Sequence, residues 1–155
     1  MNEIIHEIEE KYGSLLIRDG SKFLLGLQSF AELYRQQTRC IYLPGEKQFY
    51  QYSSGNGLWQ PQRREEMISQ VCFAIREFAN QRGLENELIR YQRPSAIRDI
   101  LIYLEVQAKE EPAFFSSSGN WIHCRNTMVE LAESGEWKMR PFSPDYHSRN
   151  RCDIV

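Results

Sequence analysis

Alternating apolar residues on both sides of a tight turn constrain the end of this 155-residue chain more than any other pattern in it. The alternating positions are Thr127, Val129, Leu131, Trp137 and Met139, and the turn between them is Glu133-Ser134-Gly135. Alternation of this kind around a glycine-containing turn predicts a β-hairpin. A hairpin commits this part of the chain to antiparallel pairing.

A polar tail follows the hairpin from Arg140 to Tyr146. Its prolines, Pro141 and Pro144, are expected to hold the backbone extended and to forbid a helix. The segment from Arg149 to Val155 has the pattern of a further strand that stops before it is complete. Natural termini more often fray in polar residues, so we expect the chain to be a piece cut from a longer protein.

The middle of the chain is predicted to be helical. Residues 65–80 carry an apolar stripe with helical spacing, formed by Met67, Ile68, Val71, Ile75, Phe78 and Ala79. A short helix is expected over 85–91. A longer amphipathic helix should follow Pro94, with Ser95 as its N-cap and Pro112 as its stop.

A three-stranded antiparallel meander is predicted ahead of these helices. Its strands are expected at 38–43, at 48–52 and from 58 onward, after a helix over 29–37 that begins with a capping box of Ser29 and Glu32. The meander is rich in aromatic residues, which either stack on nucleotide bases or form the packing face of the sheet. The fold class is therefore α+β: an antiparallel β meander, central amphipathic helices and a C-terminal β-hairpin.

Residues 1–28 form a predicted helix over 1–12 and a hairpin that turns at Asp19-Gly20. They are either an appendage, such as the tail of a preceding module, or an ordinary helix and hairpin packed on the core. We expect the domain division to fall between 1–28 and 29–155.

The motifs of common catalytic sites are missing from the sequence. It contains no Walker loop for a triphosphate, and its aspartates, Asp19, Asp99, Asp145 and Asp153, are isolated, so no pair of metal-binding carboxylates is present. Four cysteines, Cys40, Cys72, Cys124 and Cys152, lie far apart without the spacing of a zinc or thioredoxin-like site. We expect no catalysis by this chain alone, no metal, no cofactor and reduced thiols.

The charge pattern suggests where nucleic acid would bind. A net charge of -2 argues against binding by bulk charge, but basic residues concentrate near the end of the chain. The candidate nucleic-acid-binding residues are Lys138, Arg140, Arg149 and Arg151. The alternative is a solvated surface paired with some of the 21 acidic residues. No apolar run approaches the roughly 20 residues of a membrane span, so a cytoplasmic protein without a membrane partner is expected.

Two blocks of short motifs carry a resemblance to a known family. The later block comprises Asn126 to Leu131, Gly135-Glu136, Arg140, Ser143-Pro144-Asp145, Arg149-Asn150 and Asp153-Ile154-Val155. The earlier block comprises Phe30-Ala31-Glu32 through Tyr34, the strands Cys40 to Leu43 and Gln48 to Tyr52, and Gly57-Leu58-Trp59 before a helix. Over roughly Ser29 to Val155 the chain resembles the poxvirus-type primase-helicase N-terminal domain, although the Tyr-Asp-Pro that usually continues the last strand is missing.

Domains of that family stand immediately before a superfamily III (AAA+) helicase motor in phage, plasmid and large-virus replication proteins. The resemblance implies a non-catalytic collar or linker domain that supports ring assembly and contacts DNA. The implied partners are the helicase motor of the same polypeptide, weakly and non-specifically bound DNA, and further copies of the full-length protein in a homo-oligomer. The alternative is a stand-alone adaptor or weak DNA-binding module without a motor.

Overall fold

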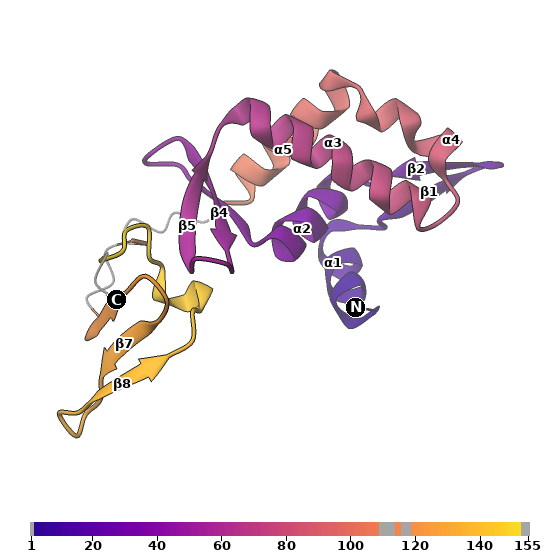
Figure 1. The fold of residues 1–155 in the computed structure, drawn as a ribbon. Coiled ribbons are helices and arrows are strands. Elements are labelled where there is room, and N and C mark those ends of the chain that lie inside the picture. Colours follow the sequence, from indigo (N-terminus) through magenta and orange to yellow (C-terminus); the bar gives the residue numbers. More distant parts are fainter. Residues whose placement is uncertain (1, 109–113, 116–118, 153–155) are drawn as a thin grey trace.

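The computed structural model describes residues 2–108, 114–115 and 119–152, and it confirms the α+β class. The helices are α1 (Asn2–Tyr12), α2 (Leu27–Thr38), α3 (Arg64–Asn80), α4 (Glu85–Leu88), α5 (Pro94–Val106) and the short 3-10 helices η1 (Ile89–Gln92) and η2 (Pro144–Tyr146). The strands are β1 (Leu16–Asp19), β2 (Lys22–Leu25), β3 (Cys40–Leu43), β4 (Gln48–Ser53), β5 (Leu58–Gln62), β6 (Trp121–His123), β7 (Met128–Leu131) and β8 (Trp137–Arg140). Within the described residues these strands form antiparallel sheets in the orders β1-β2, β3-β4-β5 and β6-β7-β8 (Figure 1).

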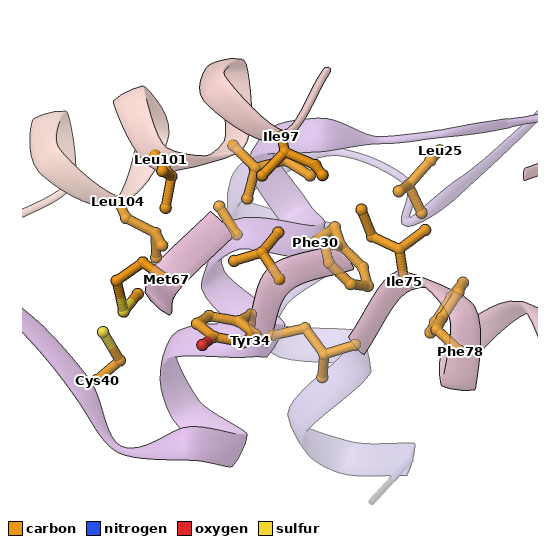
Figure 2. Packing of buried hydrophobic residues seen from close by; sticks show 14 of the residues in the cluster. Leu25, Phe30, Tyr34, Cys40, Met67, Ile75, Phe78, Ile97, Leu101 and Leu104 are labelled. Atoms are coloured by element: carbon orange, nitrogen blue, oxygen red, sulfur yellow. The ribbon is translucent and has the colours of Figure 1, made fainter. Parts of the chain in front are cut away.

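The main hydrophobic core lies where α2, α3 and α5 meet, and Figure 2 shows their side chains converging on it. The predicted stripe of α3 faces this core, with Met67, Val71 and Ile75 fully buried. The ring of Phe30 from α2 meets the edge of Phe78 from α3, with 5.5 Å between the ring centroids. Each such side chain contributes about 1.5–3 kcal/mol of burial free energy, so the contact of these three helices stabilises the fold.

The predicted capping box at the start of α2 is wrong. The helix begins at Leu27, and Gly26 occupies the N-cap position because any side chain there would collide with the carbonyl of Ser14. Ser29 lies inside the helix, is 1% exposed, and donates a hydrogen bond of 2.6 Å to the carbonyl oxygen of Gly13. Its hydroxyl therefore satisfies the end of α1 and does not cap α2.

Two further local predictions near prolines were wrong. Ser95 does not cap α5, because the helix already begins at Pro94, whose fixed φ suits the first helical position. Pro144 does not keep its segment extended but begins η2, where Ser143 Oγ accepts a hydrogen bond of 3.3 Å from the backbone N–H of Asp145. The stop predicted at Pro112 lies outside the described residues.

The first helix and hairpin pack on the same core as the rest of the chain. Ile8 of α1, together with Leu15 and Leu25 from the β1–β2 hairpin, belongs to the buried cluster of α2, α3 and α5. Of the two alternatives for residues 1–28, the contacts are those of an ordinary helix and hairpin packed on the core. The domain division at residue 28 stays a prediction.

The β3-β4-β5 meander forms as predicted, and both of its faces are covered. Phe49 joins the helical core, whereas Tyr50, Tyr52 and Trp59 form a second cluster with Phe114 and Phe115 on the opposite face. The four buried aromatic residues of the sheet are at most 8% exposed. These side chains are packing residues, so the idea that they stack on bases is not supported.

The predicted C-terminal hairpin is confirmed as β7 and β8, with Leu131 opposite Trp137 across the turn. A third strand, β6, pairs with β7 and was not predicted. In Figure 1 this C-terminal sheet lies beyond the end of β4 and β5, away from the α3 and α5 helices. Of the strand expected after Arg149, Cys152 pairs with Cys124 in an isolated bridge, and residues 153–155 lie outside the description. None of the described helices combines the length and the apolar character that crossing a membrane requires.

Candidate nucleic-acid interface

The register of the C-terminal sheet sorts its side chains onto two chemically different faces. Opposed residues point to the same side of a sheet, and neighbours along a strand point to opposite sides. One side, called the charged face, carries Trp121, His123, Met128, Glu130, Lys138 and Arg140. The other side, called the apolar face, carries Ile122, Val129, Leu131, Trp137 and Met139.

The charged face brings two of the predicted residues together. Lys138 and Arg140 alternate along β8 and are both exposed. Arg140 Nε donates to Glu130 Oε2 at 2.9 Å, and Glu130 also stands directly opposite Lys138. Glu130 therefore offsets part of the positive charge of Lys138 and Arg140.

Arg149 is placed elsewhere, against the β3–β4 hairpin. Its guanidinium lies 2.9 Å from Glu46 Oε1 and 4.9 Å from the centre of the Phe115 ring. The hydroxyl of Tyr50 donates to the other oxygen of Glu46. This hydrogen bond lowers the pKa of Glu46 most, and the contact with Arg149 lowers it further. Arg149 therefore makes an ion-paired contact between the C-terminal segment and the meander.

Arg151 is exposed and lies near His123, on the β6 side of the C-terminal sheet. Burial of the imidazole lowers the pKa of His123; the hydrogen bond to Asn56 opposes this shift, and the positive charge of Arg151 adds to it. In the described structure no hydrogen bond or ion pair links Arg149 to the β8 pair. The four predicted residues thus do not form one patch: Lys138 and Arg140 lie together, and Arg149 and Arg151 lie apart from them.

The C-terminal sheet is anchored to the β4–β5 turn by a set of contacts that we call the joint. The joint consists of Asn56, Gly57 and Trp59 on one side and His123, Phe142, Pro144 and Ser148 on the other. His123 Nε2 donates to the carbonyl oxygen of Asn56 at 2.9 Å, because that oxygen only accepts. The backbone N–H of Trp59 donates to Ser148 O at 2.7 Å, and its indole Nε1 donates to Pro144 O at 3.0 Å.

The joint explains why two distant sequence motifs occur together. Gly57-Leu58-Trp59 lies in the earlier block of the family resemblance, and Ser143-Pro144-Asp145 lies in the later one. The indole bond from Trp59 to Pro144 spans 85 residues and joins these blocks directly. The motifs are therefore the two halves of one contact that fixes the C-terminal sheet on the meander.

Sequence reasoning missed Glu130, the joint and the apolar face. Glu130 and Lys138 are equally far from Ser134 of the predicted turn along the sequence. The register of a hairpin centred there pairs them, so this pair could have been predicted. The apolar face also needed Ile122 of β6, a strand of three residues that gave no alternating pattern. The joint depends on partners that lie far apart in the sequence, such as Trp59 and Pro144 at a separation of 85 residues, for which no local signal exists.

One hollow in the described part of the chain lies away from the C-terminal sheet and is mostly apolar. A groove of about 650 Å³ between α1, α2 and α3 is lined by Phe30, Phe73, Phe78 and neighbouring, mostly uncharged side chains. Within the residues that the structure describes, no three His, Cys, Asp or Glu side chains gather closely enough to hold a metal ion.

Comparison with known protein families gives a match over most of the chain. A family model described as D5 N terminal like matches residues 28–155, a range that contains both motif blocks, the joint and all four candidate residues. Neither the curated proteins nor the solved structures gave a significant match.

Proposed function

Since the chain belongs to the D5 N terminal like family, we propose that it is a non-catalytic collar or linker domain of a replicative DNA helicase. The family places it as the N-terminal domain of a primase-helicase-type protein, associated with the helicase or primase portion of the same polypeptide. Contact with DNA and support of ring assembly make up the finer proposal. The two faces of the C-terminal sheet support it.

The observation that carries the proposal is the placement of Lys138 and Arg140 side by side on β8, where the charged face is exposed. A cation that meets a phosphate releases condensed counterions, and this term supplies most of non-specific affinity. The carboxylate of Glu130 offsets part of the local positive charge. We therefore propose weak binding of single-stranded DNA, on the order of micromolar or weaker at physiological salt.

The apolar face is proposed to contact a neighbouring copy of the domain. Trp137 is 55% exposed and Met139 is 81% exposed, and Ile122 beside them is 47% exposed. Stable interfaces bury about 800 Å² and 20–30 residues on each partner, far more than the five residues of this face. The contact is therefore too small to hold two isolated domains together. It becomes effective where linked motors already hold the copies side by side, because linkage raises the effective concentration.

The test is the salt dependence of binding to a fluorescent single-stranded oligonucleotide. The double variant Lys138→Ala/Arg140→Ala should bind more weakly, and the slope of log K against log salt should become less negative by about 1.4, from two lost contacts at about 0.7 each. The matched control is Arg18→Ala/Lys22→Ala, which removes two exposed cations from the β1–β2 hairpin. If both double variants lose the same DNA affinity, binding depends only on the overall charge of the domain, and the charged face has no special role in it.

The alternative function is a stand-alone adaptor or weak DNA-binding module that acts without a motor. The same exposed face with Trp137 and Met139 favours it, because an adaptor also needs an apolar docking surface. The two functions differ in whether the domain affects assembly of a helicase motor. An adaptor bearing Trp137→Ser keeps its DNA affinity and has no effect on motor assembly, whereas a collar domain bearing the same change lowers motor assembly.

A further inference from the structure

The fold brings together two cysteines that the sequence gave no reason to pair. Cys124 follows β6 and Cys152 lies near the end of the described chain, yet the two residues are opposite each other in an isolated parallel bridge. Both are free thiols of intermediate exposure. The backbone N–H of Cys152 donates to the carbonyl oxygen of His123 at 2.7 Å, and the N–H of Cys124 donates to that of Thr127 at 2.9 Å. Both backbones are thus held in place.

This arrangement meets the backbone requirement of a disulfide bond. Paired strands run about 4.8 Å apart, and disulfide-linked residues have Cα atoms roughly 4.4–6.8 Å apart. Opposed residues also direct their side chains to the same side of the pair. Linking Cys124 to Cys152 therefore needs rotation of the two side chains and at most a small shift of the backbone.

We propose that Cys124 and Cys152 form a site of reversible oxidation whose oxidant is a peroxide. One thiol attacks the peroxide, is oxidised to a sulfenic acid and releases one water from hydrogen peroxide. The second thiol attacks the sulfenic sulfur, the S–S bond forms, and the sulfenic hydroxyl leaves with the thiol proton as a second water. Two thiols lose two hydrogens in total, and one peroxide is reduced to two waters. A dithiol reductant reverses the step by thiol–disulfide exchange.

The disulfide would fasten the end of the described chain to the C-terminal sheet. In the reduced protein this end is held by the bridge at Cys152, by the backbone bond to Ser148 and by the exposed pair of Arg149 with Glu46. The disulfide closes a covalent loop around β7, β8 and η2, which restricts the unfolded chain and so favours the folded state. Oxidation thereby stiffens the end of the described chain, a property that the proposed collar function does not include.

The remaining cysteines provide internal controls. Cys40 is 1% exposed, and burial raises the pKa of its thiol to about 12, so it stays protonated and inaccessible. The thiol of Cys72 lies 3.9 Å from the carbonyl oxygen of Gln92. In the described structure neither of them stands opposite another cysteine in a bridge.

The test treats the purified chain, at low micromolar concentration, with hydrogen peroxide, alkylates the remaining thiols and maps the unreduced tryptic peptides by mass spectrometry. The expected product links the peptide that ends at Arg125 to the peptide that begins at Cys152. The melting temperature should rise by roughly 5–10 °C and return on addition of dithiothreitol. Cys72→Ser should behave like the wild type.

The variants Cys124→Ser and Cys152→Ser should give no such link and no rise in melting temperature, while their reduced forms melt close to the reduced wild type. Two kinds of result would overturn the proposal. One is a link that forms equally through Cys72 or only between molecules. The other is the absence of any Cys124–Cys152 peptide when methionine oxidation shows that the peroxide has reacted.

Discussion

Replacing Gly57 by alanine should weaken the joint, and the cost follows from two separate effects. Gly57 adopts a φ of +69°, in the left-handed region that disfavours residues with a side chain. An added methyl group would also lie 2.5 Å from Cγ and Cδ1 of Phe142 and 2.9 Å from its Cβ. Phe142 must then move away, and its ring also stacks on His123, with 5.0 Å between the ring centroids.

The expected magnitude is the sum of these effects. A residue with a Cβ in the left-handed region costs about 1–2 kcal/mol, and displacing a packed side chain costs about 1–3 kcal/mol. The total of about 2–5 kcal/mol is a large part of the 5–15 kcal/mol that typically stabilises a domain. Gly57→Ala should therefore lower the melting temperature by roughly 5–15 °C.

The assay is urea unfolding followed by circular dichroism, with two glycine controls. Gly135→Ala has a φ of +80° but open space around the new methyl group, so it should show the backbone cost alone. Gly45→Ala has neither a positive φ nor a neighbour within 4 Å and should be nearly neutral. If Gly57→Ala costs no more than Gly135→Ala, then Phe142 does not pack against Gly57 and the account of the joint is wrong.

Three further predictions concern pH, an ion pair and catalysis. Burial lowers the pKa of His123 in the folded protein below 6.5, so the unfolded chain is protonated first as the pH falls. The contribution of His123 to stability should therefore be full above about pH 6.5 and be lost below it. His123→Gln should flatten this pH dependence when urea unfolding is measured between about pH 7 and 5. An unchanged slope in that variant would assign the effect to other groups. Arg149→Ala should lower the free energy of unfolding by at most about 1 kcal/mol, because its ion pair with Glu46 is exposed. A double-mutant cycle with Glu46→Gln checks this, and a coupling energy well above about 1 kcal/mol would contradict the prediction. The purified chain should not hydrolyse ATP above the buffer rate, since it has no Walker loop, and measurable turnover in a coupled assay would refute the absence of catalysis.

Local chemistry made much of the fold predictable. The α3 stripe, the β3-β4-β5 meander and the β7–β8 hairpin depend on residues a few positions apart, and turns such as Asp19-Gly20 determine the register of the strands that they join. The capping box predicted at Ser29 failed because a distant group competed for its side chain. The sequence predicts Ser29 as a helix cap, but its hydroxyl instead donates to the carbonyl oxygen of Gly13, 16 residues away.

The candidate site was only partly predictable for the same reason. The predicted alternation of Trp137 and Met139 is confirmed, and it leaves Lys138 and Arg140 together on the other face of β8. The partner of Arg149, Glu46, lies 103 residues away in sequence, and no pattern indicated it. Charge composition alone therefore grouped residues that the fold separates.

The most direct test of the collar proposal is the assembly state of the polypeptide that carries this domain together with its helicase motor, measured by mass photometry with and without single-stranded DNA. The account predicts that Trp137→Ser/Met139→Ser lowers the fraction of assembled rings at a given concentration, because it removes the most exposed side chains of the apolar face. Lys138→Ala/Arg140→Ala should assemble normally and lose part of the stabilisation that DNA provides. Wild-type assembly by the first variant, together with wild-type DNA response by the second, would contradict the assignment of both faces.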